Sequence, residues 1–143
     1  MKKDVIISIN STQEFEDCDP DKISLVTEGA FYKKQNKYYI KYDESALSGI
    51  ENTKTTLKIE PDMVTLIRTG ANASQMIFKQ DEHHVGLYQT IAGPYTLGVK
   101  TKNINNAIHD EGGKLELEYE VELNYQTAGY NTFKIEIKNG GQA

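Results

Sequence analysis

Residues 115–123, with the sequence LELEYEVEL, alternate apolar and acidic side chains without a break. Successive side chains on an extended strand point to opposite faces, so this alternation predicts a β-strand with one buried face and one face in water. Residues 131–139 (NTFKIEIKN) repeat the pattern with Phe133, Ile135 and Ile137. The acidic row does not indicate a metal site, because alternate side chains on a strand stand too far apart to converge on one ion.

Turn signals divide the rest of the chain into further short strands. The first strand is expected at residues 4–10 (DVIISIN). Hairpins follow it, with turns at residues 35–36, 61–62 and 81–82, where polar residues and a proline favour chain reversal. Three irregular segments are expected: a single helical turn at 45–50, an Asn-rich loop at 103–111 and a turn at 124–131.

Consecutive hairpins leave strand edges that must be covered. A barrel covers them completely, so we expect an all-β fold in which an antiparallel meander closes into a barrel of about 8–10 strands with little helix. Residues 1–143 are expected to form this single β-barrel domain, since a chain of this length buries enough apolar surface to fold without disulfides. A two-sheet sandwich is the alternative, but sandwiches usually need longer crossovers than these turns provide.

The sequence lacks the motifs that predict catalysis, a metal or a cofactor. His83 and His84 are adjacent, and strand geometry sends them to opposite faces, so residues 81–101 predict a hairpin and not a metal site. Cys18 lies in an acidic run that disfavours its thiolate. The chain contains no Gly-x-Ser-x-Gly elbow, no phosphate-binding glycine loop and no Cys-x-x-Cys pair. We therefore expect no cofactor.

Charge and composition restrict the partners and the cellular location that we expect for the protein. The net charge is −5 and no concentrated basic face is evident, which argues against a nucleic-acid partner. No stretch approaches the roughly 20 apolar residues of a membrane span, and the apolar run at the N-terminus is too short for a signal peptide. The single cysteine, Cys18, excludes an intramolecular disulfide. We expect a cytoplasmic protein with no membrane partner.

The order of several segments resembles the DUF1934, or YwiB-like, family of small bacterial barrel proteins. The resemblance implies a calycin-like barrel, related in shape to lipocalins, in the bacterial cytoplasm, and it implies no particular activity. The segments that carry it are 29–45 (GAFYKKQNKYYIKYDES), 56–60 (TLKIE), 67–70 (IRTG), 75–80 (QMIFKQ), 86–101 (GLYQTIAGPYTLGVKT) and 115–123.

The interior of such a barrel holds either side chains or one small ligand. Arg68 shares a strand face with Val64 and Leu66, so a positive charge follows two apolar neighbours. We expect Arg68 to pair with an acid, Glu28 or Glu44, or to anchor a ligand carboxylate or phosphate through its planar guanidinium, with plain surface exposure as the third reading. The candidate ligand-binding residues are Arg68, Tyr42, Glu44, Glu28, Met76, Phe78, Tyr88, Thr90 and Thr101.

Three function classes stay open. The first is a barrel that binds a small, partly apolar molecule in its interior or mouth, where apolar walls combine with a few polar anchors. The alternative is a non-catalytic interaction or structural barrel with a packed interior, which acts through an outer face or as a homodimer. The third is an enzyme that uses Arg68 with Glu44 or Glu28 as acid–base partners.

Overall fold

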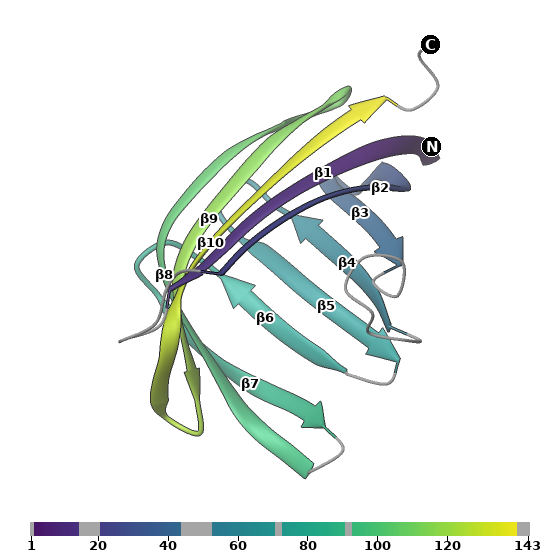
Figure 1. Cartoon of the computed structure of the whole chain (residues 1–143). Helices are drawn as coiled ribbons and strands as arrows, with labels where there is room; N and C mark the ends of the chain where they lie inside the picture. Colours follow the sequence, from purple (N-terminus) through teal and green to yellow (C-terminus); the bar gives the residue numbers. More distant parts are fainter. Residues whose placement is uncertain (1, 15–20, 44–52, 71–72, 91–92, 140–143) are drawn as a thin grey trace.

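Ten antiparallel strands form one closed barrel, as the sequence predicts, in which the strands follow one another in chain order and β1 pairs with β10 (Figure 1). The computed structural model describes residues 2–14, 21–43, 53–70, 73–90 and 93–139. Within these residues no helix is long and apolar enough to cross a membrane. The strands are β1 (Lys2–Glu14), β2 (Asp21–Lys34), β3 (Lys37–Asp43), β4 (Thr53–Ile59), β5 (Val64–Gly70), β6 (Ser74–Phe78), β7 (His83–Thr90), β8 (Gly93–His109), β9 (Gly112–Leu123) and β10 (Gln126–Asn139).

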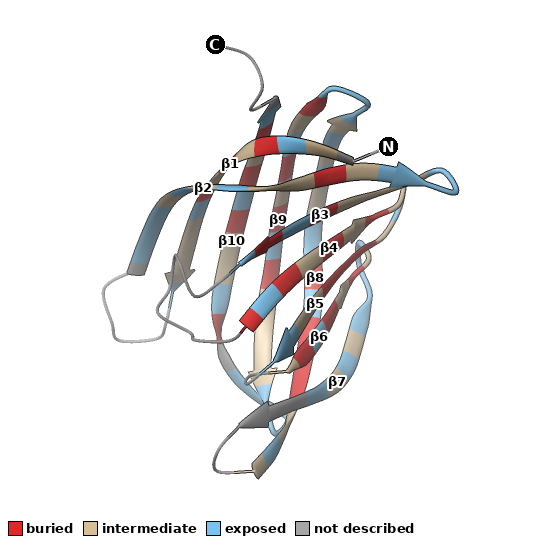
Figure 2. Cartoon of the chain, turned by 90° about the vertical axis from the view of Figure 1, so that its right-hand side faces the viewer, coloured by how far each residue is buried: buried red, intermediate tan, exposed pale blue. Residues whose placement is uncertain are grey.

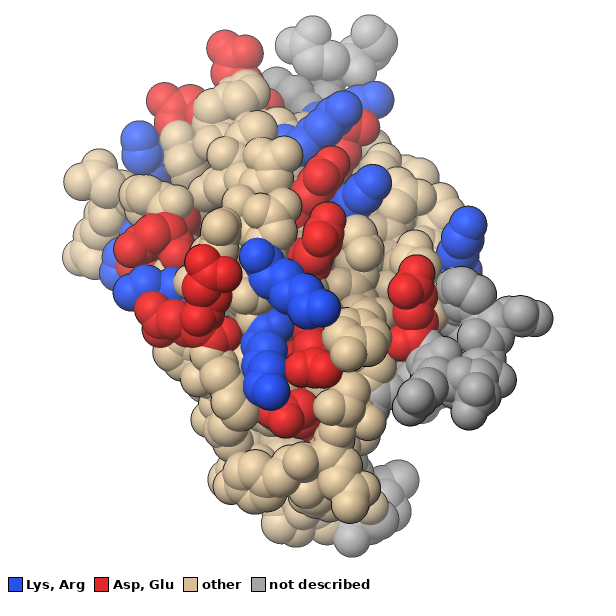
Figure 3. All heavy atoms as spheres, turned by 90° about the vertical axis from the view of Figure 1, so that its left-hand side faces the viewer, with Lys and Arg blue, Asp and Glu red and all other residues tan. Residues whose placement is uncertain are grey.

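Burial alternates along the strands, so each strand has an inner and an outer face (Figure 2). On β9, Leu115, Leu117 and Tyr119 are buried, which confirms the apolar face predicted for this segment. The intervening acids face outward and lie beside basic side chains: Lys100 Nζ is 3.7 Å from Glu120 Oε2. Lysines and acids are interspersed over this side of the barrel (Figure 3). Such exposed pairs add little stability, but they keep the outer face charged and wet.

The inward side chains of β3 to β6 form three layers, because the register places them side by side. The two layers nearest the turns at residues 35–36 and 61–62 are largely apolar and fill the barrel. The third layer is polar. The layers are Tyr38, Ile59, Val64 and Phe78; Ile40, Leu57, Leu66 and Met76; and Tyr42, Thr55, Arg68 and Ser74.

The structure corrects two expectations about irregular segments. Residues 103–111, expected as a loop, lie mostly in β8, which pairs with β9 beyond a bulge between Thr101 and Asn103. Ile104 and Ile108 pack against the core there, so the asparagines conceal a strand periodicity. The turn before β10 is confined to residues 124–125, with positive φ at both, and is shorter than the predicted 124–131. The expected helical turn at 45–50 lies outside the described residues.

One place in the barrel wall has almost no ladder. Among the described residues, β6 and β7 share a single register pair, Ser74 with Tyr88, whereas β4 and β5 pair along the whole of Thr53–Ile59. The connection between β6 and β7 is hydrogen-bonded to β8 instead: the Asp81 amide donates to the Thr101 carbonyl (2.9 Å), and the Thr101 amide donates to the Glu82 carbonyl (3.1 Å). We call this place, where the ladder between β6 and β7 is short, the seam.

Gly29 tests how closely β2 and β3 are packed. A Cβ at this position would overlap the Lys41 carbonyl oxygen and lie 2.5 Å from the Ile7 Cδ1 methyl. We expect Gly29→Ala to lower the free energy of unfolding by about 1–3 kcal/mol, as overpacked sites do. Urea denaturation measures the change. Val26→Ala on the same strand, at a position 69% exposed, is the control and should stay within about 0.5 kcal/mol of wild type. Equal stabilities of the two variants would contradict the close packing.

Candidate functional site

The barrel interior holds a cavity of about 390 Å³ at the level of the polar layer. We call it the interior cavity. Leu25, Leu66, Met76 and Phe133 contribute apolar wall. Its polar lining comes from six strands: Ser11, Gln13, Tyr42, Arg68, Ser74, Tyr119 and Asn131. An apolar wall with a few convergent polar groups, at this volume, is the usual composition of a small-molecule site.

Arg68 lies inside the barrel, on the face that Val64 and Leu66 predict. The β-ladders place it between Thr55 of β4 and Ser74 of β6. Its charge acts on the Tyr119 hydroxyl, which comes from β9 on another part of the wall. Arg68 already has an interaction partner within the chain. Its five N–H donors in a planar fork allow it to hold more than one acceptor.

Tyr119 is a buried titratable residue of this cavity. Burial raises the pKa of its hydroxyl above 10.0, while a hydrogen bond with Asn131 and the positive charge of Arg68 act in the opposite direction. Its ring packs edge-to-face on Phe78, with centroids 4.7 Å apart. The phenol therefore stays protonated in the folded protein at neutral pH and offers a hydroxyl to the cavity.

Three buried hydroxyls stand without hydrogen-bond partners among the described residues: Thr55 Oγ1, Ser74 Oγ and Thr101 Oγ1. A buried hydroxyl without a partner costs roughly 1–3 kcal/mol. Ser74 lines the interior cavity, where a ligand atom can take the missing bond. Thr55 lies in the same layer as Ser74, two strands away across Arg68, but it does not line the cavity.

The other predicted site residues fall into three groups. Tyr42 and Met76 line the interior cavity. Phe78 is fully buried beneath it, and Thr101 is buried in the wall of β8, so both belong to the described core and not to the described lining. Glu44 and the side chains of Tyr88 and Thr90 lie outside the described residues.

Glu28 does not reach Arg68, so this expected pair is wrong. Its neighbour Gly29 faces inward, since a Cβ there would meet Ile7 and Tyr42. Strand alternation then turns Glu28 outward, where it is exposed. The sequence supplied the parity of each strand, but not which parity of β2 faces the core.

Sequence reasoning missed Ser74, Tyr119 and Asn131 as lining residues. Each carried a usable signal, because each shares strand parity with apolar residues: Ser74 with Met76, and Asn131 with Phe133. A polar residue that continues an apolar face toward a strand end marks the level at which the barrel interior becomes polar. Tyr119 lies on the apolar face of residues 115–123, so the alternation predicts it as a core residue.

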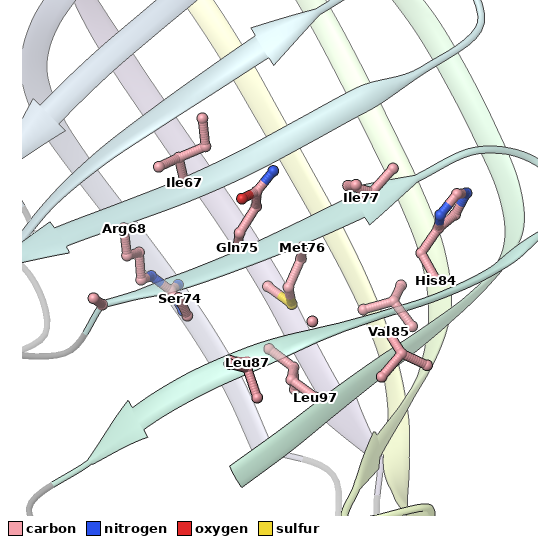
Figure 4. Close-up of a pocket in the computed structure, with 13 residues that line it drawn as sticks. Ile67, Arg68, Ser74, Gln75, Met76, Ile77, His84, Val85, Leu87 and Leu97 are labelled. Carbon is pink, nitrogen blue, oxygen red and sulfur yellow. The ribbon is translucent and has the colours of Figure 1, made fainter. Parts of the chain in front are cut away.

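A second cavity, of about 470 Å³, lies at the seam and adjoins the first (Figure 4). Four residues line both: Arg68, Ser74, Met76 and Leu97. Its outer wall comes from the outward side chains of β5, β6 and β7, which we call the outer groove. The residues of the outer groove are Ile67, Gln75, Ile77, Val85 and Leu87.

The two adjacent histidines point to opposite faces of β7, as predicted. His83 Nε2 lies 2.6 Å from Glu122 Oε1 on the outer surface, and His84 Nε2 lies 3.0 Å from Glu82 Oε1. Within the described part of the chain, no group of three or more His, Cys, Asp or Glu side chains is placed to hold a metal ion.

Comparisons with known proteins agree with this fold. Residues 7–135 match the family model described as domain of unknown function DUF1934. The uncharacterized beta-barrel protein YwiB of Bacillus subtilis (strain 168) is 26% identical over 144 residues and is covered completely, as is this chain. The crystal structure of the ywiB protein from Bacillus subtilis superposes with a TM-score of 0.84 at 23% identity, over 97% of this chain and 93% of that one.

The buried Tyr119 hydroxyl predicts a specific pH dependence. Its pKa is raised in the folded state, so the unfolded chain loses this proton first, and the stability that the tyrosine contributes is lost as the pH rises above 10.0. We expect wild type to lose up to about 1.4 kcal/mol per pH unit there relative to Tyr119→Phe. Urea denaturation of both proteins between neutral and alkaline pH measures this difference. Parallel curves for the two proteins above pH 10.0 would show that the hydroxyl is not buried.

Proposed function

We propose that this chain, which belongs to the DUF1934 family, binds a small, partly apolar molecule that carries an anionic group, and that it does so inside the barrel. The ligand occupies the interior cavity, with its apolar body against Leu66, Met76 and Phe133. Its anionic oxygen accepts hydrogen bonds from Arg68 and Ser74. The protein acts as a calycin-like carrier in the bacterial cytoplasm, the setting that the family resemblance implies.

One observation carries this proposal: Ser74 is 8% exposed, and its hydroxyl has no hydrogen-bond partner among the described residues although it lines the cavity. A core built only for stability would place an apolar side chain there. A ligand acceptor satisfies the hydroxyl and removes its desolvation cost. The nearby positive charge of Arg68 selects an acceptor that is negative, because a carboxylate fits the guanidinium fork.

The two other classes have less support. An interaction barrel with a packed interior does not need unpaired hydroxyls at a cavity wall. An enzyme that uses Arg68 with Glu28 has no support, since Glu28 lies on the outer surface, and Glu44, the other acid considered, lies outside the described residues. Among the described residues, exposed Val85 and Leu87 in the outer groove favour an interaction surface.

Ser74→Ala separates a ligand role from a structural one. We expect the variant to be as stable as wild type, or more stable by up to about 1 kcal/mol, because it removes a buried hydroxyl without a partner. We expect its affinity for hexanoate, a small aliphatic carboxylate, to fall about tenfold, as for the loss of one hydrogen bond to a charged group. Calorimetric titration measures the affinity, and urea denaturation measures the stability.

Thr55→Val is the matched control. Its hydroxyl is buried and has no partner among the described residues, as at Ser74, but Thr55 does not line the cavity, so we expect unchanged hexanoate affinity. Arg68→Met should abolish hexanoate binding through loss of the positive charge. No hexanoate binding by wild type, or equal binding by wild type, Ser74→Ala and Arg68→Met, would overturn the proposal.

A further inference from the structure

We propose that the interior cavity binds both ends of its ligand, and that the ligand is a carboxylate with an uncharged amide at the far end of its apolar body. This inference rests on the proposed function and extends it from a small anionic molecule to a class of molecules with two polar ends. The carboxylate lies at Arg68 and Ser74. The amide lies at Gln13 and Asn131, on the opposite wall.

The strand order places these two polar pairs on opposite sides of the barrel. Arg68 of β5 and Ser74 of β6 form a register pair, and the Arg68 side chain extends toward Ser74 (Figure 4). Gln13 of β1 and Asn131 of β10 also form a register pair. In the closed order of strands, β1 and β6 stand opposite each other, and so do β10 and β5. Both pairs line the interior cavity, so a ligand between them can contact both.

The Gln13 and Asn131 pair differs in its chemistry from the Arg68 end of the cavity. Gln13 continues the inner face of β1 beyond Ile9 and is only partly buried, so its amide is open to the cavity. The Asn131 amide is held by its hydrogen bond with the Tyr119 hydroxyl. Two neighbouring carboxamides offer both N–H donors and carbonyl acceptors, and a ligand carboxamide needs both.

The rest of the cavity lining determines the charge and the body of the ligand. Among the described lining residues, Arg68 alone carries a charge. A second carboxylate, or an ammonium group, at the Gln13 end would be desolvated there without an opposite charge, which is costly. Leu25 of β2 and Leu97 of β8 lie on the two sides of the wall between the polar pairs. The lining therefore fits one negative charge, an apolar body and a neutral polar end.

Three molecules of nearly the same shape test the amide end. Adipamate, the monoamide of adipic acid, is compared with adipate and with the branched acid in which an isopropyl group replaces the amide. We expect wild type to bind adipamate about tenfold more tightly than either. The second carboxylate of adipate lacks a positive partner, and the isopropyl group leaves the amides of Gln13 and Asn131 unpaired. Calorimetric titration measures the affinities, and the homologues one methylene shorter and one longer are compared in the same way.

Gln13→Met removes one amide and keeps an unbranched side chain of similar length. We expect its affinity for adipamate to fall about fivefold, as for the loss of a hydrogen bond between neutral groups, and its preference over the isopropyl analogue to be lost. Thr12→Val is the matched control, because strand alternation places Thr12 on the outer face of β1. This variant should keep the wild-type preference for adipamate.

The outcomes separate this inference from the proposed function. Hexanoate binding that depends on Ser74, without a preference for the terminal amide at any of the three lengths, overturns the inference and leaves the proposed function standing. Adipate that binds as tightly as adipamate also overturns it, since the far end would then accept a charge. A preference that persists in Gln13→Met overturns the assignment of the amide to Gln13 and Asn131. No carboxylate binding at all overturns both the inference and the proposed function.

Discussion

The ladder between β1 and β10 is the interaction on which the rest of the molecule depends. It joins ten residue pairs, from Val5 with Asn139 to Glu14 with Tyr130, and so turns a linear meander into a closed wall. Closure gives every strand a definite inside, which is why Ile7, Leu117 and Ile135 are almost completely buried. The polar layer with Arg68 exists only because this wall surrounds it.

The apolar layers and the polar layer of the interior contribute differently to stability. The apolar layers, with Ile59, Leu57 and Phe78 almost completely buried, stabilise the fold by removing hydrocarbon from water. The polar layer lowers the stability of the fold, because Thr55 and Ser74 bury hydroxyls that lack partners among the described residues. A sequence that keeps such groups inside departs from the best-packed core at these positions, and such departures are expected at functional sites.

Alternation and turn chemistry were enough to predict the fold class, the approximate strand count and the hairpin turns at residues 35–36, 61–62 and 81–82, because these are local properties of the chain. The inward parity of Arg68 was also predictable from Val64 and Leu66. The inward face of β2 was not predictable. The sequence does not tell whether the face with Glu28 or the face with Gly29 points to the core, because this depends on how β2 pairs with β1 and β3. The extension of β8 through Ile104 and Ile108 was hidden by asparagines, and the seam depends on contacts of Thr101 with a distant turn.

The pairing of β1 with β10 also constrains how the chain is assembled. These strands are the first and the last of the barrel in chain order. The ladder between β1 and β10 can therefore form only after β10 has been synthesised. Until then β1 has an unpaired edge, and contacts this distant in sequence form slowly. Barrel closure is therefore a late event in biogenesis, and the nascent chain depends on its early hairpins, from β2 to β5, to keep apolar side chains from neighbouring chains.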